Sequence, residues 1–275
     1  FKLDKLEQPI PFIDKALCTN CDLCRRICPQ NTRQPLNYPS KCYVAFSCNP
    51  EDLIFSASGG VGAMFYRHMM EMNAAAFGCD YDQNAKLRHF KLKNEDDLIN
   101  VRSSKYSQSK AYVVFEEIKR LLLEKVKVLF VGTPCQVAGL LAFLQKKYDN
   151  LITVDLICHG TPPNEVLRKH LEEQRIEGPI SKIRFRGEFD QMLTIWKDAE
   201  IVYQKDRRGD LYFSAFYRNM ISCESCYNCQ YAIKERVSDI TIGDFWGIGQ
   251  LEKIEKKSNR PSIVLLNTPK GLDFF

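Results

Sequence analysis

Hydrophobic and polar positions follow two different periods along most of the chain. Short runs of β-branched and other apolar residues predict strands at 127–131, 151–158, 183–186, 193–203, 237–242 and 263–267. Longer stretches with apolar residues every three or four positions predict helices at 61–77, 112–125, 136–147 and 164–174. Strands that alternate with helices favour an α/β fold with a mixed, partly parallel sheet covered by helices.

The first 47 residues show neither period, and they are rich in Pro and Cys. They contain the run C-x2-C-x2-C-x3-C-P, formed by Cys18, Cys21, Cys24, Cys28 and Pro29. Three thiolates at this spacing can bind one 4Fe–4S cube, and in two-cluster ferredoxins the fourth Cys ligates the other cluster. A zinc knuckle is less consistent with a single block, because zinc sites favour two separated CxxC pairs. We therefore predict a ferredoxin-like 4Fe–4S module at residues 1–47 and a second domain at residues 48–275.

The ends of the sequence affect the expected number of clusters. The chain starts at Phe1 and stops at Phe275, so we expect that one or both ends are missing. Cys28 would serve a second cluster if another run lies upstream, and would complete the first cluster if none does. Cys42 and Cys48 fall in no recognisable spacing and are expected to be buried free thiols.

Composition narrows the class of protein. The chain has 275 residues, of which 45% are hydrophobic and 27% charged, as in a folded globular protein. Its 12 Cys are bunched in motifs, which indicates metal ligation in a reducing compartment and predicts a cytoplasmic protein. We find no signal peptide and no apolar stretch long enough to span a membrane. The net charge of +5 comes without a basic run interleaved with aromatics, so we expect no nucleic-acid binding.

A second set of cysteines lies in the C-terminal half. Cys135 starts a predicted helix and Cys158 ends a predicted strand, so both are expected at the carboxyl edge of the sheet, where ligands bind. Cys226 and Cys229 form a CxxC, and Cys223 extends it upstream. Residue type leaves two iron–sulfur sites open: these two pairs together, or the trio at 223, 226 and 229 with one more Cys. Buried inert thiols at 135 and 158, or a structural zinc turn at 226 and 229, are further alternatives.

Other motifs are weaker by themselves. The segment 56–60 contains Ser58, Gly59 and Gly60 before a predicted helix, and such a loop can bind phosphate through backbone N–H groups, although taken alone a plain turn explains it better. The segment 243–247, GDFWG, reads as an aromatic core plug between turn glycines. His159 lies between Cys158 and a Gly at the predicted ligand edge, where it would exchange protons or be merely structural. The other three His are expected to be surface or packing residues.

Taken in order along the chain, these motifs resemble the coenzyme F420 hydrogenase/dehydrogenase β-subunit family. The resemblance spans nearly the whole chain and is carried by SGG at 58–60, KYSQS at 105–109, VGTPCQVAGL at 131–140, DLICHGTP at 155–162, CYNC at 226–229 and DITIGDFWG at 239–247. It implies an FAD-binding domain at residues 48–275 that also holds a 4Fe–4S cluster close to the flavin. The family's ligand positions carry over to Cys135, Cys158, Cys226 and Cys229, with Cys223 outside the pattern. Its flavin contacts carry over to Ser58, Gly59, Gly60, Lys105, Tyr106, Gln108, Thr133 and Pro134.

The resemblance also implies a function. We expect an oxidoreductase that passes electrons between 4Fe–4S clusters and FAD, and that reduces or oxidises a small-molecule substrate or a deazaflavin coenzyme. The family also includes relatives resembling 7-hydroxymethyl chlorophyll a reductase and many bacterial members. The His in CHG makes the chain resemble the bacterial members more than the hydrogenase subunit, so use of coenzyme F420 is not the leading expectation. The expected catalytic residue is His159, and the expected partner is ferredoxin or another redox protein, with a homo-oligomer left open. Two alternatives remain: an electron-transfer subunit without its own substrate site, and a zinc-bearing thiol protein.

Overall fold

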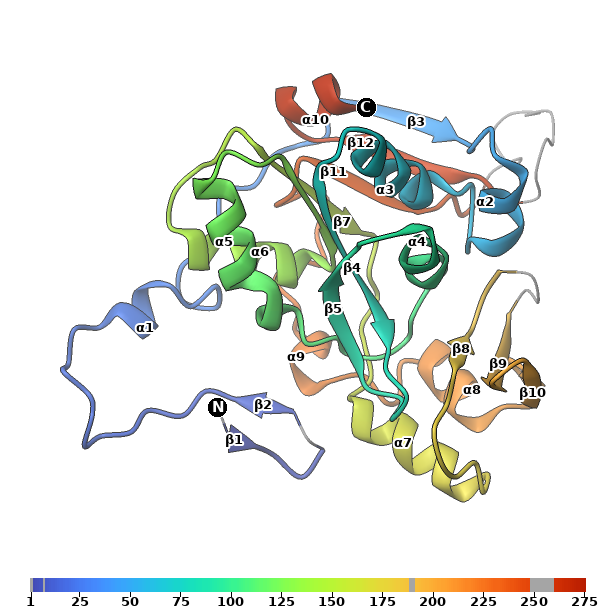
Figure 1. The fold of residues 1–275 in the computed structure, drawn as a ribbon. Coiled ribbons are helices and arrows are strands. Elements are labelled where there is room, and N and C mark those ends of the chain that lie inside the picture. Colours follow the sequence, from blue (N-terminus) through green and yellow to red (C-terminus); the bar gives the residue numbers. More distant parts are fainter. Residues whose placement is uncertain (1, 7, 188–190, 248–259) are drawn as a thin grey trace.

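A seven-stranded mixed sheet forms the centre of the protein. The computed structural model describes residues 2–6, 8–187, 191–247 and 260–275. In spatial order the strands are β3 (Lys41–Ala45), β12 (Ser262–Leu266), β11 (Ile240–Asp244), β7 (Leu151–Leu156), β6 (Val128–Gly132), β4 (Ala75–Tyr81) and β5 (Leu87–Lys91). β11, β7, β6 and β4 run parallel, and the other three strands pair antiparallel at the two edges (Figure 1). The predicted mixed α/β architecture is confirmed.

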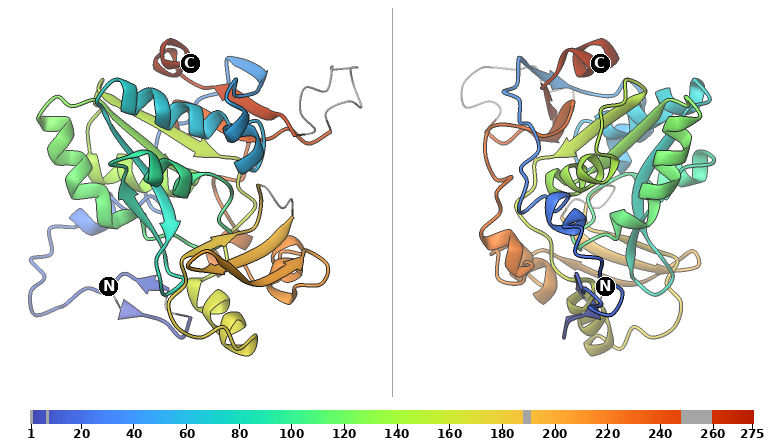
Figure 2. Two further views of the ribbon diagram at one scale, coloured as in Figure 1. Left: turned by 45° about the vertical axis from the view of Figure 1, so that its right-hand side comes forward. Right: turned by 90° about the vertical axis from the view of Figure 1, so that its left-hand side faces the viewer.

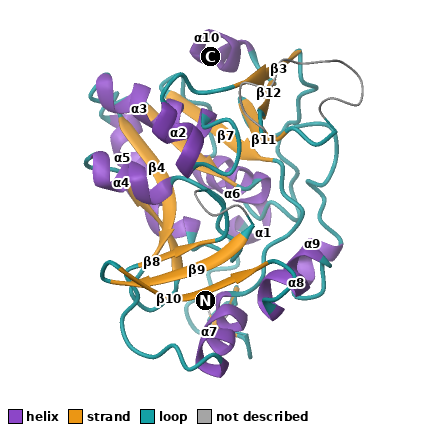
Figure 3. Cartoon of the chain, turned by 90° about the vertical axis from the view of Figure 1, so that its right-hand side faces the viewer, coloured by secondary structure: helices purple, strands orange, loops and turns teal. Residues whose placement is uncertain are grey.

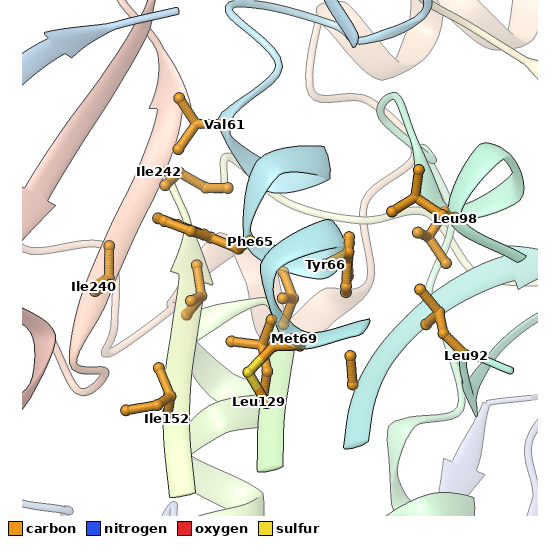
Figure 4. Packing of buried hydrophobic residues seen from close by; sticks show 14 of the residues in the cluster. Val61, Phe65, Tyr66, Met69, Leu92, Leu98, Leu129, Ile152, Ile240 and Ile242 are labelled. Carbon is orange, nitrogen blue, oxygen red and sulfur yellow. The ribbon is translucent and has the colours of Figure 1, made fainter. Parts of the chain in front are cut away.

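Helices cover both faces of this sheet. On one face lie α3 (Val61–Glu71) and α4 (Glu95–Val101), and on the other lie the 3-10 turn η1 (Ala111–Val114), α5 (Phe115–Leu123) and α6 (Pro134–Leu144). Successive side chains of a strand point to opposite faces. In β6, Leu129 therefore packs with Phe65 and Met69 of α3, as Figure 4 shows, whereas Phe130 packs under α5 and α6.

A smaller layer lies beside the large sheet. The hairpin β9 (Met192–Lys197) and β10 (Glu200–Asp206) pairs with β8 (Lys182–Arg184). With α7 (Asn164–Glu173) and α8 (Leu211–Tyr217) it encloses a separate aromatic-rich core (Figure 3). The remaining helices are α2 (Pro50–Phe55), α9 (Glu224–Tyr227) and α10 (Pro269–Phe274).

The N-terminal segment extends away from the large sheet before joining it. It contains the two-residue strands β1 (Lys2–Leu3) and β2 (Pro9–Ile10) and the single turn α1 (Leu23–Arg26), as Figures 1 and 2 show. Asn37 then forms a backbone bridge with Arg236, and β3 pairs with β12. The sheet therefore continues across the predicted domain boundary at residue 47, and the ferredoxin-like module stays a prediction.

Several predicted elements need correction. The helix predicted at 61–77 ends at Glu71, and Asn73 turns the chain with a φ of 51° before β4 begins. An Ala-rich apolar run fits a helix and a buried parallel strand equally well, which explains the error. The strand predicted at 193–203 is a hairpin that turns at Asp198, with a φ of 51°. β7 ends at Leu156, so Cys158 lies in the following loop.

Two more expectations are wrong: the burial of Cys42 and Cys48, and the residue at which one helix begins. Cys42 and Cys48 are exposed, because β3 is an edge strand and the loop after it lies at the surface. The helix predicted from residue 136 begins at Pro134, where a proline is favoured because the first turn leaves its N–H groups without helical partners. Within the described ranges, no helix has both the length and the apolar character needed to cross a bilayer.

Candidate functional site

A cleft of about 280 Å³ opens at the carboxyl ends of the parallel strands. Its walls come from the ends of β4, β6, β7 and β11, the start of α3, the loop between α4 and η1, and α8. This is the edge at which open α/β sheets bind ligands. Of the predicted cofactor and catalytic residues, it brings together Ser58, Gly60, Lys105, Tyr106, Thr133 and His159.

The N-terminus of α3 faces this cleft without a side-chain cap. Gly60 is its N-cap residue, with a left-handed φ of 78°, and Val61, Gly62 and Ala63 of the first turn all line the cleft. The free N–H groups of a first helical turn, together with the helix dipole, bind anions. The loop for which phosphate binding is predicted therefore lies at the cleft, and its role stays a prediction.

Gly59 has a structural role beside that loop. Its carbonyl accepts a hydrogen bond from the Ser47 backbone N–H at 2.6 Å. A Cβ at this position would lie 2.3 Å from the Ala45 carbonyl oxygen and 2.8 Å from the Ser262 amide nitrogen. Only glycine lets the loop approach the ends of β3 and β12 so closely. Ser58 is fixed there by a 2.9 Å hydroxyl–hydroxyl contact with Ser262.

Aromatic side chains form another wall of the cleft. The Tyr106 ring stacks on Phe216 with 4.3 Å between ring centroids and an interplanar angle of 22°. The His159 ring lies 4.7 Å from Phe216, and Tyr217 completes this wall. Trp246 also lines the cleft and is 70% exposed, so the interpretation of GDFWG as a core plug is wrong. Such a wall suits a flat conjugated ring system.

Lys105 is held by backbone oxygens. Its ammonium donates to the carbonyls of Asn100 and Arg102 at 2.7 and 2.6 Å, and it lies 3.8 Å from Asp80. Burial lowers the pKa of Lys105 to about 8, although the Asp80 carboxylate opposes that shift. Because an ammonium has three donors, contacts with the C-terminal carbonyls of α4 take up most of its capacity. The lysine therefore fixes the loop that lines the cleft.

A chain of hydrogen-bonded side chains joins the cleft to the start of α6. Thr133 and Gln136 form a capping box there, and the Gln136 side-chain amide also donates to the Ser109 hydroxyl at 2.7 Å. Ser109 contacts His89 Nδ1 at 3.1 Å, and His89 Nε2 lies 3.0 Å from the Val131 carbonyl. A carbonyl only accepts, so Nε2 carries the proton and Nδ1 accepts from the serine. Burial lowers the pKa of His89 to about 4, although the Val131 carbonyl opposes the shift.

Two residues that were predicted to contact the flavin, Pro134 and Gln108, hold neighbouring elements of the fold in place. Pro134 is buried at the first position of α6. Gln108 ties the loop before η1 to the loop after β7: its N–H donates to the Pro162 carbonyl at 2.7 Å, and its carbonyl accepts from the Asn164 side chain at 2.6 Å. Its side-chain oxygen also lies 3.6 Å from the Cys223 sulfur.

The C-terminal cysteines gather at one end of the cleft, where Cys158 itself lines it. Burial raises the pKa of Cys158 to about 12, with a hydrogen bond from Gly160 N–H opposing the shift and Cys135, Cys226 and Cys229 adding to it. Burial also raises the pKa of Cys135, with Thr133 opposing the shift and Cys229 and Cys226 adding to it. These four thiols therefore lie within electrostatic range of one another. Over the described ranges, no three or more His, Cys, Asp or Glu side chains are arranged around a single-ion position.

Cys223 accompanies this group. A hydrogen bond from its thiol lowers the pKa of Cys226 below the ordinary value of a thiol, and that interaction raises the pKa of Cys223 itself. Cys223 is buried, its N–H donates to the Thr161 carbonyl at 2.9 Å, and it belongs to the same turn as Cys226. Both ligand sets considered from the sequence remain compatible with this placement.

The ferredoxin-like run also touches this region. The side-chain amide of Gln230 donates to the Pro29 carbonyl at 2.7 Å, and the Tyr231 hydroxyl donates to the same oxygen at 3.4 Å. Pro29 follows Cys28, and Gln230 follows Cys229. Cys18, Cys21 and Cys24 are exposed, further out along the segment.

The sequence analysis missed several residues of the cleft, among them Arg186 and His89. Arg186 lines it and donates to Asp244 at 2.8 Å and to the Ala57 carbonyl at 2.7 Å, joining the small sheet to the large one. His89 lines it as well, although it was expected only to pack or lie at the surface. No local motif marks either residue, because each reaches the cleft only through the packing of separate elements.

Comparison with known proteins identifies the family. A family model, described as the C terminus of the coenzyme F420 hydrogenase/dehydrogenase beta subunit, matches residues 125–275. The fold is similar to that of a chain from the xenon-derivatised F420-reducing [NiFe] hydrogenase complex of Methanosarcina barkeri. The TM-score is 0.58 and the sequence identity 15%, covering 87% of this chain and 78% of that chain. None of the curated proteins matches the chain. With more than half of its length matched by the family model, the chain belongs to the coenzyme F420 hydrogenase/dehydrogenase β-subunit family.

Proposed function

We propose that this protein is an iron–sulfur flavoprotein oxidoreductase whose cleft holds FAD beside a 4Fe–4S cluster. One observation carries the proposal: the turn at 157–161 belongs both to the cleft and to the thiol group. His159 lines the cleft, and the preceding residue, Cys158, is one of the four mutually interacting thiols. Because the Cys158 thiol also lines the cleft, a flavin there and a cluster on these thiols would be close enough to exchange electrons.

The cleft offers what FAD requires. Its pyrophosphate would bind the free N–H groups at the start of α3, next to Ser58 and Gly60. Its ring system would lie against the wall formed by Tyr106 and its aromatic neighbours. Thr133, which follows the end of β6, would line the same cleft. Lys105 would support FAD indirectly, because it holds the loop that carries Tyr106. When bound, FAD would link one-electron transfer to two-electron chemistry.

The donor set fits iron–sulfur clusters. Cysteine thiolates are the ligands that such clusters use, and a cube holds its four thiolates farther apart than a single ion does. Cys135, Cys158, Cys226 and Cys229 would hold one cluster. Cys18, Cys21, Cys24 and Cys28 would hold the N-terminal cluster, for which the intact ferredoxin run is the support. Both sets consist only of thiols, which disfavours the oxygen- and nitrogen-rich sites of other metals.

His159 is the proposed catalytic residue. It is exposed in the cleft and packs on Phe216, so a substrate in the cleft would meet its imidazole. A proton placed by such a side chain is typically worth about 10²–10⁴-fold in rate. We expect His159→Ala to keep FAD and iron but to lose turnover with reduced methyl viologen as donor and a deazaflavin coenzyme as acceptor. Normal turnover by this variant would leave the histidine a purely structural role.

The partners follow from the same chemistry. We propose ferredoxin or another redox protein as donor, and a small molecule or a deazaflavin coenzyme as substrate. The similar chain from the F420-reducing hydrogenase complex makes membership of a larger redox assembly a natural arrangement. An electron-transfer subunit without its own substrate would need no cleft beside the thiols, so the cleft favours the enzyme.

A visible spectrum of anaerobically purified protein tests the proposal. Flavin bands on top of broad iron–sulfur absorption, with extractable FAD, are the expected result. Iron–sulfur absorption without flavin would instead favour an electron-transfer subunit. A colourless protein that contains zinc would overturn the proposal in favour of a thiol protein.

A further inference from the structure

The ferredoxin-like run is fastened to the CxxC turn at a defined point. The Pro29 carbonyl accepts both donors from the C-terminal turn, Gln230 Nε2 at 2.7 Å and the Tyr231 hydroxyl at 3.4 Å. Each partner is one or two residues from a cysteine, because Pro29 follows Cys28, and Gln230 and Tyr231 follow Cys229. The contact therefore joins the two cysteine groups directly.

Neighbouring contacts extend this attachment. Tyr231 is buried, and it belongs to the hydrophobic cluster against which Leu36 and Cys229 pack. A few residues on, Asn37 and Arg236 exchange two backbone hydrogen bonds of 2.8 Å each. Residues 28–37 therefore run along residues 229–236 with both ends of the contact held by hydrogen bonds.

We infer that Gln230 and Tyr231 are positioning residues that dock the N-terminal cluster against the second one, so that electrons pass between them inside the chain. The alternative is a mobile arm, in which the N-terminal run would carry electrons from a partner and meet the second cluster only transiently. An arm would need a free hinge next to its cluster, but the residues after Cys28 are the ones held by hydrogen bonds. This inference rests on the proposed function, since it requires both clusters.

Electron paramagnetic resonance of the reduced, anaerobically reconstituted protein tests the docking. Two paramagnetic clusters fixed near each other split each other's signals. We expect a split spectrum from the unaltered protein and a simple one from Cys21→Ala, in which only the second cluster remains. Gln230→Glu combined with Tyr231→Phe removes both donors and sets a carboxylate against the Pro29 carbonyl. Loss of two hydrogen bonds should raise the undocked population by roughly 30-fold, and the splitting should weaken while iron and sulfide stay unchanged.

The control is Tyr227→Phe, a change in the same CxxC turn at an exposed tyrosine, which should leave the splitting intact. Two fully assembled clusters without splitting, or unchanged splitting in the double variant, would overturn the docking while leaving the proposed function standing. Absence of iron and sulfide from the unaltered protein would overturn both.

Discussion

At the scale of single residues, Gly59 shows how tightly the proposed phosphate loop is built. A methyl group there would collide with backbone atoms of β3 and β12, which cannot move as a flexible side chain can. Gly59→Ala should lower the free energy of unfolding by about 1–3 kcal/mol or more, as overpacking does.

The measurement is a denaturant melt, with Gly139→Ala as the matched control. In α6 the added methyl of that control would meet only Phe115, at 3.8 Å, and alanine favours the helix by up to about 1 kcal/mol. Equal stability of the Gly59→Ala variant and the unaltered protein would contradict the close approach described here.

Because His89 is buried, we expect the free energy of unfolding to depend on pH. It is 2% exposed, and burial lowers its pKa from 6.5 to about 4. The unfolded chain therefore binds the proton more readily than the folded protein does. The stabilisation is fully present above pH 6.5 and is lost as the pH falls toward 4, at about 1.4 kcal/mol per unit of pH for a single proton.

Urea melts between pH 7 and pH 4 would measure this loss. His89→Gln keeps an amide donor for the Val131 carbonyl but cannot titrate, so its stability should depend less on pH over the same range. An identical slope in both proteins would show that other groups cause the acid sensitivity.

At the scale of elements, one substitution at the start of α3 should raise the stability of the helix and weaken cofactor binding. Gly62 lies in its first turn and lines the cleft, and an added Cβ would meet only Ile242, at 3.4 Å. In Gly62→Asp the new carboxylate should stabilise the free protein by about 0.3–1 kcal/mol through the helix dipole. The same charge should repel the FAD pyrophosphate and weaken FAD binding by roughly tenfold.

Thermal melts without FAD and fluorescence titrations with FAD measure the two effects. Gly62→Asn, similar in shape but uncharged, should bind FAD better than Gly62→Asp does. Stronger FAD binding by the aspartate variant would place the pyrophosphate elsewhere.

The elements that the sequence predicted well are those with one unambiguous period. The strand at 127–131, the helix at 164–174 and the strand at 263–267 lie within one residue of β6, α7 and β12. The failures occur where local pattern is ambiguous, as in the Ala-rich run that is shared between α3 and β4. The hairpin β9–β10 was predicted as a single strand, because its turn at Asp198 contains no Gly or Pro to mark it.

At the scale of the whole molecule, the sequence predicts those parts of the candidate site that motifs place at the ends of strands. It does not predict the parts that depend on contacts between separate elements. Residues of the loops at 58–60 and 105–106 and of the turn at 158–159 line one cleft, and their role as flavin contacts stays a prediction. The full side-chain environment of Lys105 could not be predicted, since it depends on the carbonyls of α4. Nor could the contact between Pro29 and Gln230, which joins residues 201 positions apart.

The central claim is that FAD and a cluster share the turn at 157–161, and iron, sulfide and FAD analysis of cysteine variants tests it most directly. All three are measured in one anaerobic sample of each variant. Cys158→Ala should lose one cluster's worth of iron while the N-terminal cluster remains, and Cys223→Ala should keep both clusters. If Cys158→Ala keeps all of its iron and Cys223→Ala loses a cluster, the cluster belongs to the trio at 223, 226 and 229, and the shared turn is contradicted.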